Sequence, residues 1–168
     1  MKILIAYSSR TGNTKKVAEA LYEGAPEGTV LADMDACPAA DDFDLIFAGY
    51  WADRGAPDAK AQRFLRTLAK KRVVLFQTSG ASPMSEHAYT VFANAGTCLA
   101  EGNRVIGVFA VQGAVDPALV EQMRKMPKGS AHNSSQMEAT VKEAASHPDE
   151  EDLLRARAYM KAVIAKIR

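Results

Sequence analysis

Five short apolar runs, separated by segments with helical periodicity, constrain the fold of this chain more than any other feature. The runs cover residues 2–7, 29–33, 44–50, 72–78 and 104–112 and are rich in β-branched and aromatic residues. Strands that are apolar on both faces are typical of a parallel sheet with helices on both sides. The alternation therefore predicts an α/β protein, a three-layer α/β/α sandwich around a five-stranded parallel sheet.

The segments between the runs carry apolar stripes at helical spacing, for example at Ala61, Phe64 and Leu65. Ser82 and Asp116 are the predicted N-caps of two helices, because each precedes a proline and proline is favoured in the first helical turn. The whole chain, residues 1–168, is expected to form one domain. We interpret the polar stretch at about 127–148 as a surface excursion of that domain, and residues 149–168 as a final helix.

Charge and composition exclude several classes of protein. The chain has 21 Lys and Arg against 20 Asp and Glu, so it lacks the basic excess of a nucleic-acid-binding protein. Cys37 and Cys98 lie far apart and outside any metal-ligand spacing, so no metal site is expected. The apolar start is too short for a signal peptide, and the longest apolar run, LIFAGYWA, is too short to cross a bilayer. We therefore expect a cytoplasmic protein without a membrane span.

The stretch YSSRTGNT, residues 7–14, places many hydrogen-bond donors at the exit of the first apolar run. A turn from a strand into a helix exposes backbone N–H groups at the positive end of the helix dipole, where a phosphate dianion can bind. An ordinary helix cap in a polar turn is the alternative interpretation. The GxGxxG pattern of dinucleotide enzymes and the lysine-containing loop of nucleotide hydrolases are both missing. The candidate ligand-binding residues here are Ser8, Ser9, Arg10, Thr11, Gly12, Asn13 and Thr14.

A second candidate loop, GYWADRG, follows the third apolar run and contains the only tryptophan of the chain, Trp51. The carboxyl ends of parallel strands share one edge of the sheet, so this loop is expected beside the phosphate-binding turn. An aromatic side chain at that position favours stacking on a flat ligand over the alternative role of a core residue. The candidate residues of this loop are Tyr50, Trp51, Ala52, Asp53, Arg54 and Gly55.

These stretches resemble the flavodoxin family. SSRTGNT is similar to its phosphate loop, GYWADRG to its aromatic second flavin loop, and QTSGASPMS, after the fourth apolar run, stands where its third flavin loop lies. The resemblance implies a strand order of 2-1-3-4-5 and FMN as cofactor. It also implies that residues 9–14 hold the phosphate, that Trp51 stacks on the flavin ring and that Gly55 or a neighbouring loop residue presents a backbone group to flavin N5. In the third loop it implies backbone contacts to the ring from Thr78, Ser79, Gly80 and Ala81.

Three stretches, GYWADRG, VQGAVDP and ASHPDEEDL, together resemble a branch of single-domain flavodoxin-like proteins from anaerobic bacteria that has been linked to reduction of tetrapyrrole pigments.

The sequence departs from the common flavodoxin pattern in two respects. The third loop has Ser82 and Met84 where a second aromatic residue usually covers the flavin, and Tyr89 substitutes for it only if it turns toward the ligand.

The second departure is the charge of the three rim loops. The positive residues Arg10, Lys15, Lys16, Arg54 and Lys60 outnumber the negative residues Asp53, Asp58 and Glu86 by two. An excess of positive charge stabilises the anionic, fully reduced flavin and attracts acidic surfaces. We therefore expect a hydroquinone couple less negative than in acidic flavodoxins, and redox partner proteins that dock through an acidic face.

The function expected from these features is that of an FMN-binding electron-transfer protein that shuttles electrons between redox proteins. The first alternative is an NAD(P)H-dependent FMN or quinone reductase of the same fold, with Arg10 and Arg54 holding the nicotinamide nucleotide. The second is a non-redox phosphate- or ligand-binding module. No side chain is predicted to be catalytic, and His87, His132 and His147 are assigned no chemistry because they lack metal-ligand spacing.

Overall fold

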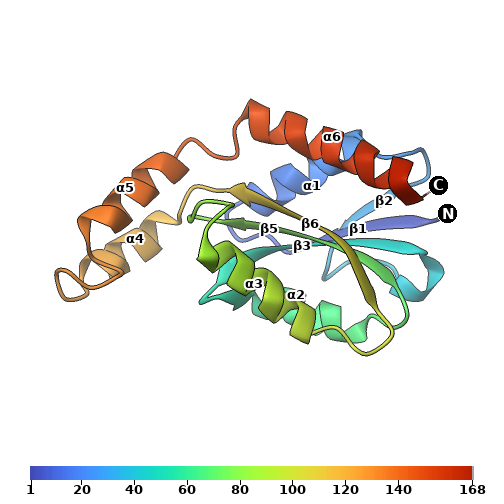
Figure 1. The fold of residues 1–168 in the computed structure, drawn as a ribbon, viewed down its shortest axis with the longest axis horizontal. Coiled ribbons are helices and arrows are strands. Elements are labelled where there is room, and N and C mark those ends of the chain that lie inside the picture. Colours follow the sequence, from blue (N-terminus) through green and yellow to red (C-terminus); the bar gives the residue numbers. More distant parts are fainter. Residues whose placement is uncertain (168) are drawn as a thin grey trace.

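A parallel sheet of five strands lies between two helical layers in the computed structural model, which describes residues 1–167 (Figure 1). The strands run in the order β2-β1-β3-β5-β6. Counted along the chain without the short β4, this is the predicted order 2-1-3-4-5, so the predicted fold class is confirmed. The strands are β2 (Val30–Asp33), β1 (Ile3–Tyr7), β3 (Leu45–Asp53), β5 (Arg72–Ser79) and β6 (Arg104–Gln112).

Alternate residues of the central strands enter two separate cores, which explains why the strands are apolar on both faces. Leu4 and Ala6 of β1 face a core with α2 (Ala59–Thr67) and α3 (Glu86–Thr97). Ile3 and Ile5 face the opposite core with α1 (Asn13–Glu23) and α6 (Glu150–Ile167). Both cores end at the carboxyl edge of the sheet, where the candidate loops begin. Within residues 1–167, no helix combines the length and apolar character that a membrane span requires.

The third strand is longer than predicted. It continues through Trp51 to Asp53 and then pairs antiparallel with β4 (Ala56–Pro57), in the register Ala52 to Pro57 and Asp53 to Ala56. Arg54 and Gly55 between them have φ values of +51° and +80°. Two consecutive residues with positive φ form a tight hairpin turn. Half of the predicted second loop is therefore a rigid strand extension.

Helix ends were predicted with mixed success. Asp116 caps α4 (Pro117–Arg124) as expected, since its carboxylate accepts from the N–H of Ala118 at 2.9 Å. The prediction for α3 was wrong: the helix begins at Glu86, and the cap is Ser85, whose hydroxyl accepts from the N–H of Ala88 at 3.2 Å. Ser82 instead starts a turn, because its carbonyl accepts from both the backbone N–H and the hydroxyl of Ser85.

The polar stretch predicted as a surface excursion contains α5 (Ser135–Ala144), in which Met137 and Ala144 are buried. Together with α4 it forms a pair of helices that projects beyond the arrowheads of β5 and β6 (Figure 1). A single turn of 3₁₀ helix, Ala40–Asp42, precedes β3 on the other side of the molecule.

Candidate functional site

Three loops predicted to bind a ligand meet at the carboxyl edge of the sheet. The hydroxyls of Thr14 and Thr78 lie 2.8 Å apart and buried, which joins the first loop to the third. The hydroxyl of Ser8 donates to Asp58 Oδ1 at 2.8 Å, and the backbone N–H of Asp58 donates to the carbonyl of Trp51 at 3.2 Å. The first and second loops are thereby connected through Asp58, by its buried carboxylate on one side and its backbone N–H on the other.

The first loop has the geometry of an anion-binding turn. Ser9 Oγ accepts hydrogen bonds from the backbone N–H groups of Gly12 at 3.1 Å and Lys15 at 3.3 Å. Gly12 is the N-cap of α1, with φ +96°, and contributes no side chain of its own. Two backbone donors at the helix start thus converge on one oxygen, that of Ser9, and a phosphate oxygen can accept from the same two N–H groups in its place.

Trp51 is partly exposed at the end of the sheet, and the Arg10 guanidinium lies 5.5 Å from the centre of its ring. The neighbouring Tyr50 is fully buried in the core beneath α2 and α3, and this burial raises the pKa of its phenol. Side chains alternate along a strand, so Tyr50 and Trp51 point to opposite faces. The prediction of a ligand contact through the Tyr50 side chain does not agree with this burial, and Trp51 is the aromatic side chain of this loop that reaches the surface.

Gly55 belongs to the part of the second loop from which a backbone group is predicted to face flavin N5, and its carbonyl accepts a hydrogen bond from the side-chain amide of Asn94 at 2.7 Å. Asn94 lies on α3, in a segment that the sequence interpretation assigned only to packing. A change in the orientation of the Gly55 peptide therefore requires loss of this bond. Ala52, Asp53 and Arg54 complete the loop; Asp53 and Arg54 are exposed.

The third loop is attached to the end of β6. Gln112 Nε2 donates to the Gly80 carbonyl at 3.0 Å, and the Gly113 N–H donates to the Ser79 carbonyl at 2.8 Å. A side chain at Gly80 would place its Cβ 2.3 Å from Val115 Cγ2, so only glycine fits there. Ser79, Gly80 and Ala81 are partly buried. The buried amide of Gln112 thus fixes the shape of this loop.

The two residues considered as a cover for the outer flavin face are both exposed. Met84 is 76% and Tyr89 is 53% solvent-accessible, and Tyr89 Oη lies 3.9 Å from Met84 Sδ. Tyr89 is therefore a surface residue of α3. The pair forms an apolar surface at the start of α3, next to the third loop.

Ion pairs change the charge balance that the sequence predicted for the rim. Arg10 pairs with Asp116 at 3.0 Å, and Lys60 pairs with Asp33 at 2.9 Å and Asp35 at 2.7 Å. Hydrogen bonds to the two carboxylates raise the pKa of Lys60. These three carboxylates come from outside the loops that were counted, and they outweigh the excess of two positive charges. The prediction of a net positive rim is therefore wrong: with these carboxylates included, the negative groups outnumber the positive groups.

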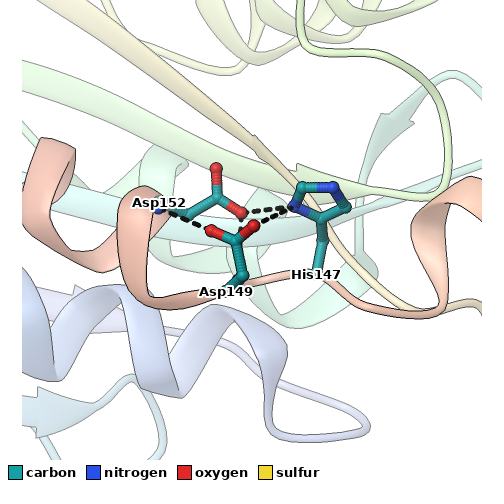
Figure 2. Close-up of side chains that lie close together, drawn as sticks. All are labelled: His147, Asp149 and Asp152. Carbon is teal, nitrogen blue, oxygen red and sulfur yellow. Dashed lines mark hydrogen bonds and ion pairs between the residues drawn. The ribbon is translucent and has the colours of Figure 1, made fainter.

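A buried carboxylate that the sequence interpretation missed lies at the start of α6. Asp149 Oδ1 accepts from the N–H of Asp152 at 2.9 Å, and Asp152 Oδ2 accepts from the N–H of Asp149 at 3.1 Å (Figure 2). This reciprocal pair is a capping box, and the D-x-x-D spacing could have indicated it. His147 Nδ1 lies 2.5 Å from Asp152 Oδ2, and Arg155 binds Oδ1 of the same carboxylate.

This cluster connects α6 to the candidate site. The His147 carbonyl accepts from the N–H of Ala114 at 2.9 Å, and the Ala114 carbonyl accepts from Asn13 Nδ2 of the first loop at 2.9 Å. The hydrogen bond to Asp152 raises the pKa of His147. Although burial opposes it, the bonds from His147, Asp149 and Arg155 lower the pKa of Asp152. His147, Asp149 and Asp152 lie close enough together to bind a metal, but both oxygens of Asp152 already accept from the protein. We interpret the group as a helix cap.

A doubly wound parallel sheet with an anion-binding turn and a partly exposed tryptophan at its carboxyl edge defines the flavodoxin-like class of α/β proteins. The chain belongs to the flavodoxin family, because residues 4–161 match the model of the family described as a flavodoxin domain. It is 31% identical over 172 residues to the flavodoxin-like domain-containing protein BilS of Clostridioides difficile, covering 99% of this chain and 98% of that protein.

Solved structures agree with this fold. Oxidised flavodoxin 2 from Bacillus cereus matches with a TM-score of 0.59 and 21% identity, covering 99% of both chains. A flavoprotein from Lactobacillus acidophilus, solved in complex with FMN, matches with a TM-score of 0.54 and 21% identity over 72% of this chain and 97% of the other. At these identities the likeness shows the fold.

Proposed function

We propose that the chain binds FMN without a covalent link and carries electrons between redox proteins. The observation that carries the proposal is the meeting of the anion-binding turn and the partly exposed Trp51 at one edge of the sheet. A phosphate site and an aromatic platform at that edge match the two ends of FMN. Membership of the flavodoxin family and the FMN complex of the Lactobacillus acidophilus flavoprotein support the choice of cofactor.

Each loop of this chain has a distinct role in the proposal. The N–H groups of Gly12 and Lys15, with the hydroxyls of Ser9 and Thr11, hold the phosphate. Trp51 stacks on the ring and excludes water from one of its faces. The third loop offers backbone groups to the polar edge of the ring, in a position fixed by Gln112.

Bound FMN supplies one- and two-electron redox chemistry, and the protein sets its orientation and electrostatic surroundings. Arg54 at the hairpin tip and Arg10 next to the tryptophan are the positive residues of the proposed ring site. Asp116 reduces the field of Arg10, because the two side chains form an ion pair.

Two measurements test the cofactor. Freshly purified protein should show the yellow flavin absorption band, and a colourless preparation should bind added FMN in a one-to-one ratio. Riboflavin lacks the phosphate and should bind much more weakly. Equal affinities for FMN and riboflavin would contradict the role given to residues 8–14, and a protein that never binds FMN would leave the non-redox module as the better explanation.

A third measurement separates an electron carrier from a reductase. The holoprotein is mixed with NADPH, and separately with NADH, without oxygen. A carrier should retain its flavin band for minutes, because it depends on a protein donor. Rapid bleaching that saturates with nicotinamide concentration would instead establish the NAD(P)H-dependent reductase.

A further inference from the structure

The helices α4 and α5 form a projecting unit, residues 117–144, that we call the α4–α5 arm. Its base is attached to the candidate flavin site at three points. Asp116, the N-cap of α4, pairs with Arg10, and the Ala114 carbonyl accepts from Asn13 of the phosphate loop. Val115 packs so closely on Gly80 that no side chain fits at that position. The arm therefore begins at the rim of the site and projects from the same edge of the sheet (Figure 1).

The arm has an internal framework that holds its shape. Arg124 on α4 makes two hydrogen bonds to Glu138 on α5, at 2.7 Å and 2.9 Å. In the connecting loop, the side-chain amide of Asn133 donates to the carbonyls of Arg124 at 3.0 Å and Met126 at 2.6 Å. Val120 and Met137 are buried, one from each helix. Such a preorganised surface pays little ordering entropy when a partner binds.

The end of the arm is basic and partly apolar. Residues 125–134 contain Lys125 and Lys128, both exposed, and no acidic residue. Met126 lies between them and is 45% solvent-accessible. The charge of the preceding Arg124 is compensated by Glu138, and that of Arg10 at the base by Asp116. Within residues 1–167 neither lysine forms an ion pair, so the two flank an exposed methionine as a positive pair, and methionine is enriched at protein interfaces.

We propose that the α4–α5 arm is the docking surface for an acidic electron-transfer protein, with Lys125, Met126 and Lys128 as its contact group. The proposal rests on the proposed electron-transfer function. The acidic character of the partner follows from charge complementarity. Carboxylates that pair with Arg10 and Lys60 remove the positive excess of the rim, whereas the tip of the arm carries two lysines and no acidic residue. A partner guided by the arm reaches the same edge of the sheet at which the flavin would bind. Such steering acts mainly on the association rate.

An electron-transfer experiment with protein probes of opposite charge tests the inference. The FMN-loaded protein is mixed in a stopped-flow instrument with a reduced acidic [2Fe–2S] ferredoxin, each molecule of which gives one electron to the flavin and becomes oxidised. The variant Lys125→Glu/Lys128→Glu should lower the second-order rate constant by about tenfold or more at low ionic strength. The difference should shrink as salt is added. With basic cytochrome c as electron acceptor of the reduced protein, the same variant should react faster.

The matched control is Lys161→Glu/Lys166→Glu, which makes the same charge change at exposed positions of α6. This part of α6 lies near the C-terminus, at the end of the molecule away from the arm (Figure 1). The control should change the second-order rate constant with ferredoxin by no more than about twofold relative to the unmodified protein. Charges farther from the docking surface than the screening length contribute little to the attraction. Equal effects of the two variants, or an unchanged rate in the arm variant, would overturn the docking assignment.

The proposed function is checked before each mixing experiment by the flavin absorption band. If the band is missing, the cofactor assignment fails, and this outcome is separate from failure of the docking surface. If the band is present and reaction with ferredoxin is independent of salt for the unmodified protein, the acidic partner is excluded. Both variants should keep the FMN affinity and melting temperature of the parent protein, because the four lysines are exposed and have no part in the flavin site.

Discussion

Replacement of Asp58 by alanine should destabilise the fold and weaken FMN binding together. Asp58 is only 4% solvent-accessible, and its Oδ1 accepts from three donors: Ser8 Oγ at 2.8 Å, Lys60 N–H at 3.1 Å and Ala61 N–H at 3.3 Å. The first bond supports the phosphate loop and the other two cap α2. Asp58→Ala removes all three and leaves the buried Ser8 hydroxyl without its acceptor.

The cost can be estimated from these bonds. Loss of an N-cap costs about 1 kcal/mol, and an unsatisfied buried hydroxyl costs about 1–3 kcal/mol, so the total is about 2–4 kcal/mol. For a domain of this size, each kcal/mol corresponds to a fall in melting temperature of about 2–4 °C, which gives about 4–16 °C in total. Asp58→Asn keeps the Oδ1 acceptor and should cost less than half as much.

Thermal unfolding followed by circular dichroism measures the first effect, with Asp53→Ala as the control. Asp53 is an acidic residue of the same segment, but it is exposed. Titration of the variants with FMN and with riboflavin measures the second effect. Because Ser8 belongs to the phosphate loop, Asp58→Ala should weaken FMN binding more than riboflavin binding. A melting temperature as little changed as that of Asp53→Ala would refute the role of Asp58 as the joint between the loops.

Three other expectations can be tested on the same preparations. Trp51→Ala should weaken FMN binding by about 1–3 kcal/mol through lost stacking and burial, with an unchanged far-ultraviolet circular dichroism spectrum. Arg54→Glu, alone or with Arg10→Glu, should lower the potential of the hydroquinone couple by on the order of tens of millivolts, and anaerobic redox titration that shows no change or a rise would contradict this. Because Asp152 raises the pKa of His147, the stabilisation from that pair is fully present below the ordinary histidine pKa of 6.5 and is lost as the pH rises through the raised value. His147→Gln should therefore lower the melting temperature at pH 6 and have a smaller effect at pH 9.

The centre of the sheet could be predicted from the sequence because β1, β3 and β5 are buried on both faces. Burial on both faces leaves continuous apolar runs, and the run at residues 72–78 lies within β5. The extension of β3 to Asp53 was missed because Ala52 and Asp53 are poor strand formers. Their pairing with β4 depends on the turn at Arg54 and Gly55, where the positive φ of a non-glycine residue is not evident from its type.

The position of the candidate site was predictable for a similar reason. Loops after parallel strands share one edge, so their nearness follows from the strand order alone. The groups that fix the loops were not predictable in the same way. Asn94, which binds the Gly55 carbonyl, and Gln112, which binds the Gly80 carbonyl, are single polar residues on elements whose patterns indicate only packing. Their partners are set by the tertiary fold.

Charge near the site shows why a local count of residues is a poor guide to an electrostatic surface. Arg10 and Lys60 belong to loops that contain few acids, yet each is compensated by carboxylates from distant parts of the chain. The field at the flavin therefore depends on these pairs. The arm differs from the rim in this respect. Lys125 and Lys128 lie in a stretch without acidic residues, and the nearby Glu138 is already paired with Arg124. A partner with an acidic face would gain more from the tip of the arm than from the rim, since only uncompensated charge contributes to long-range attraction.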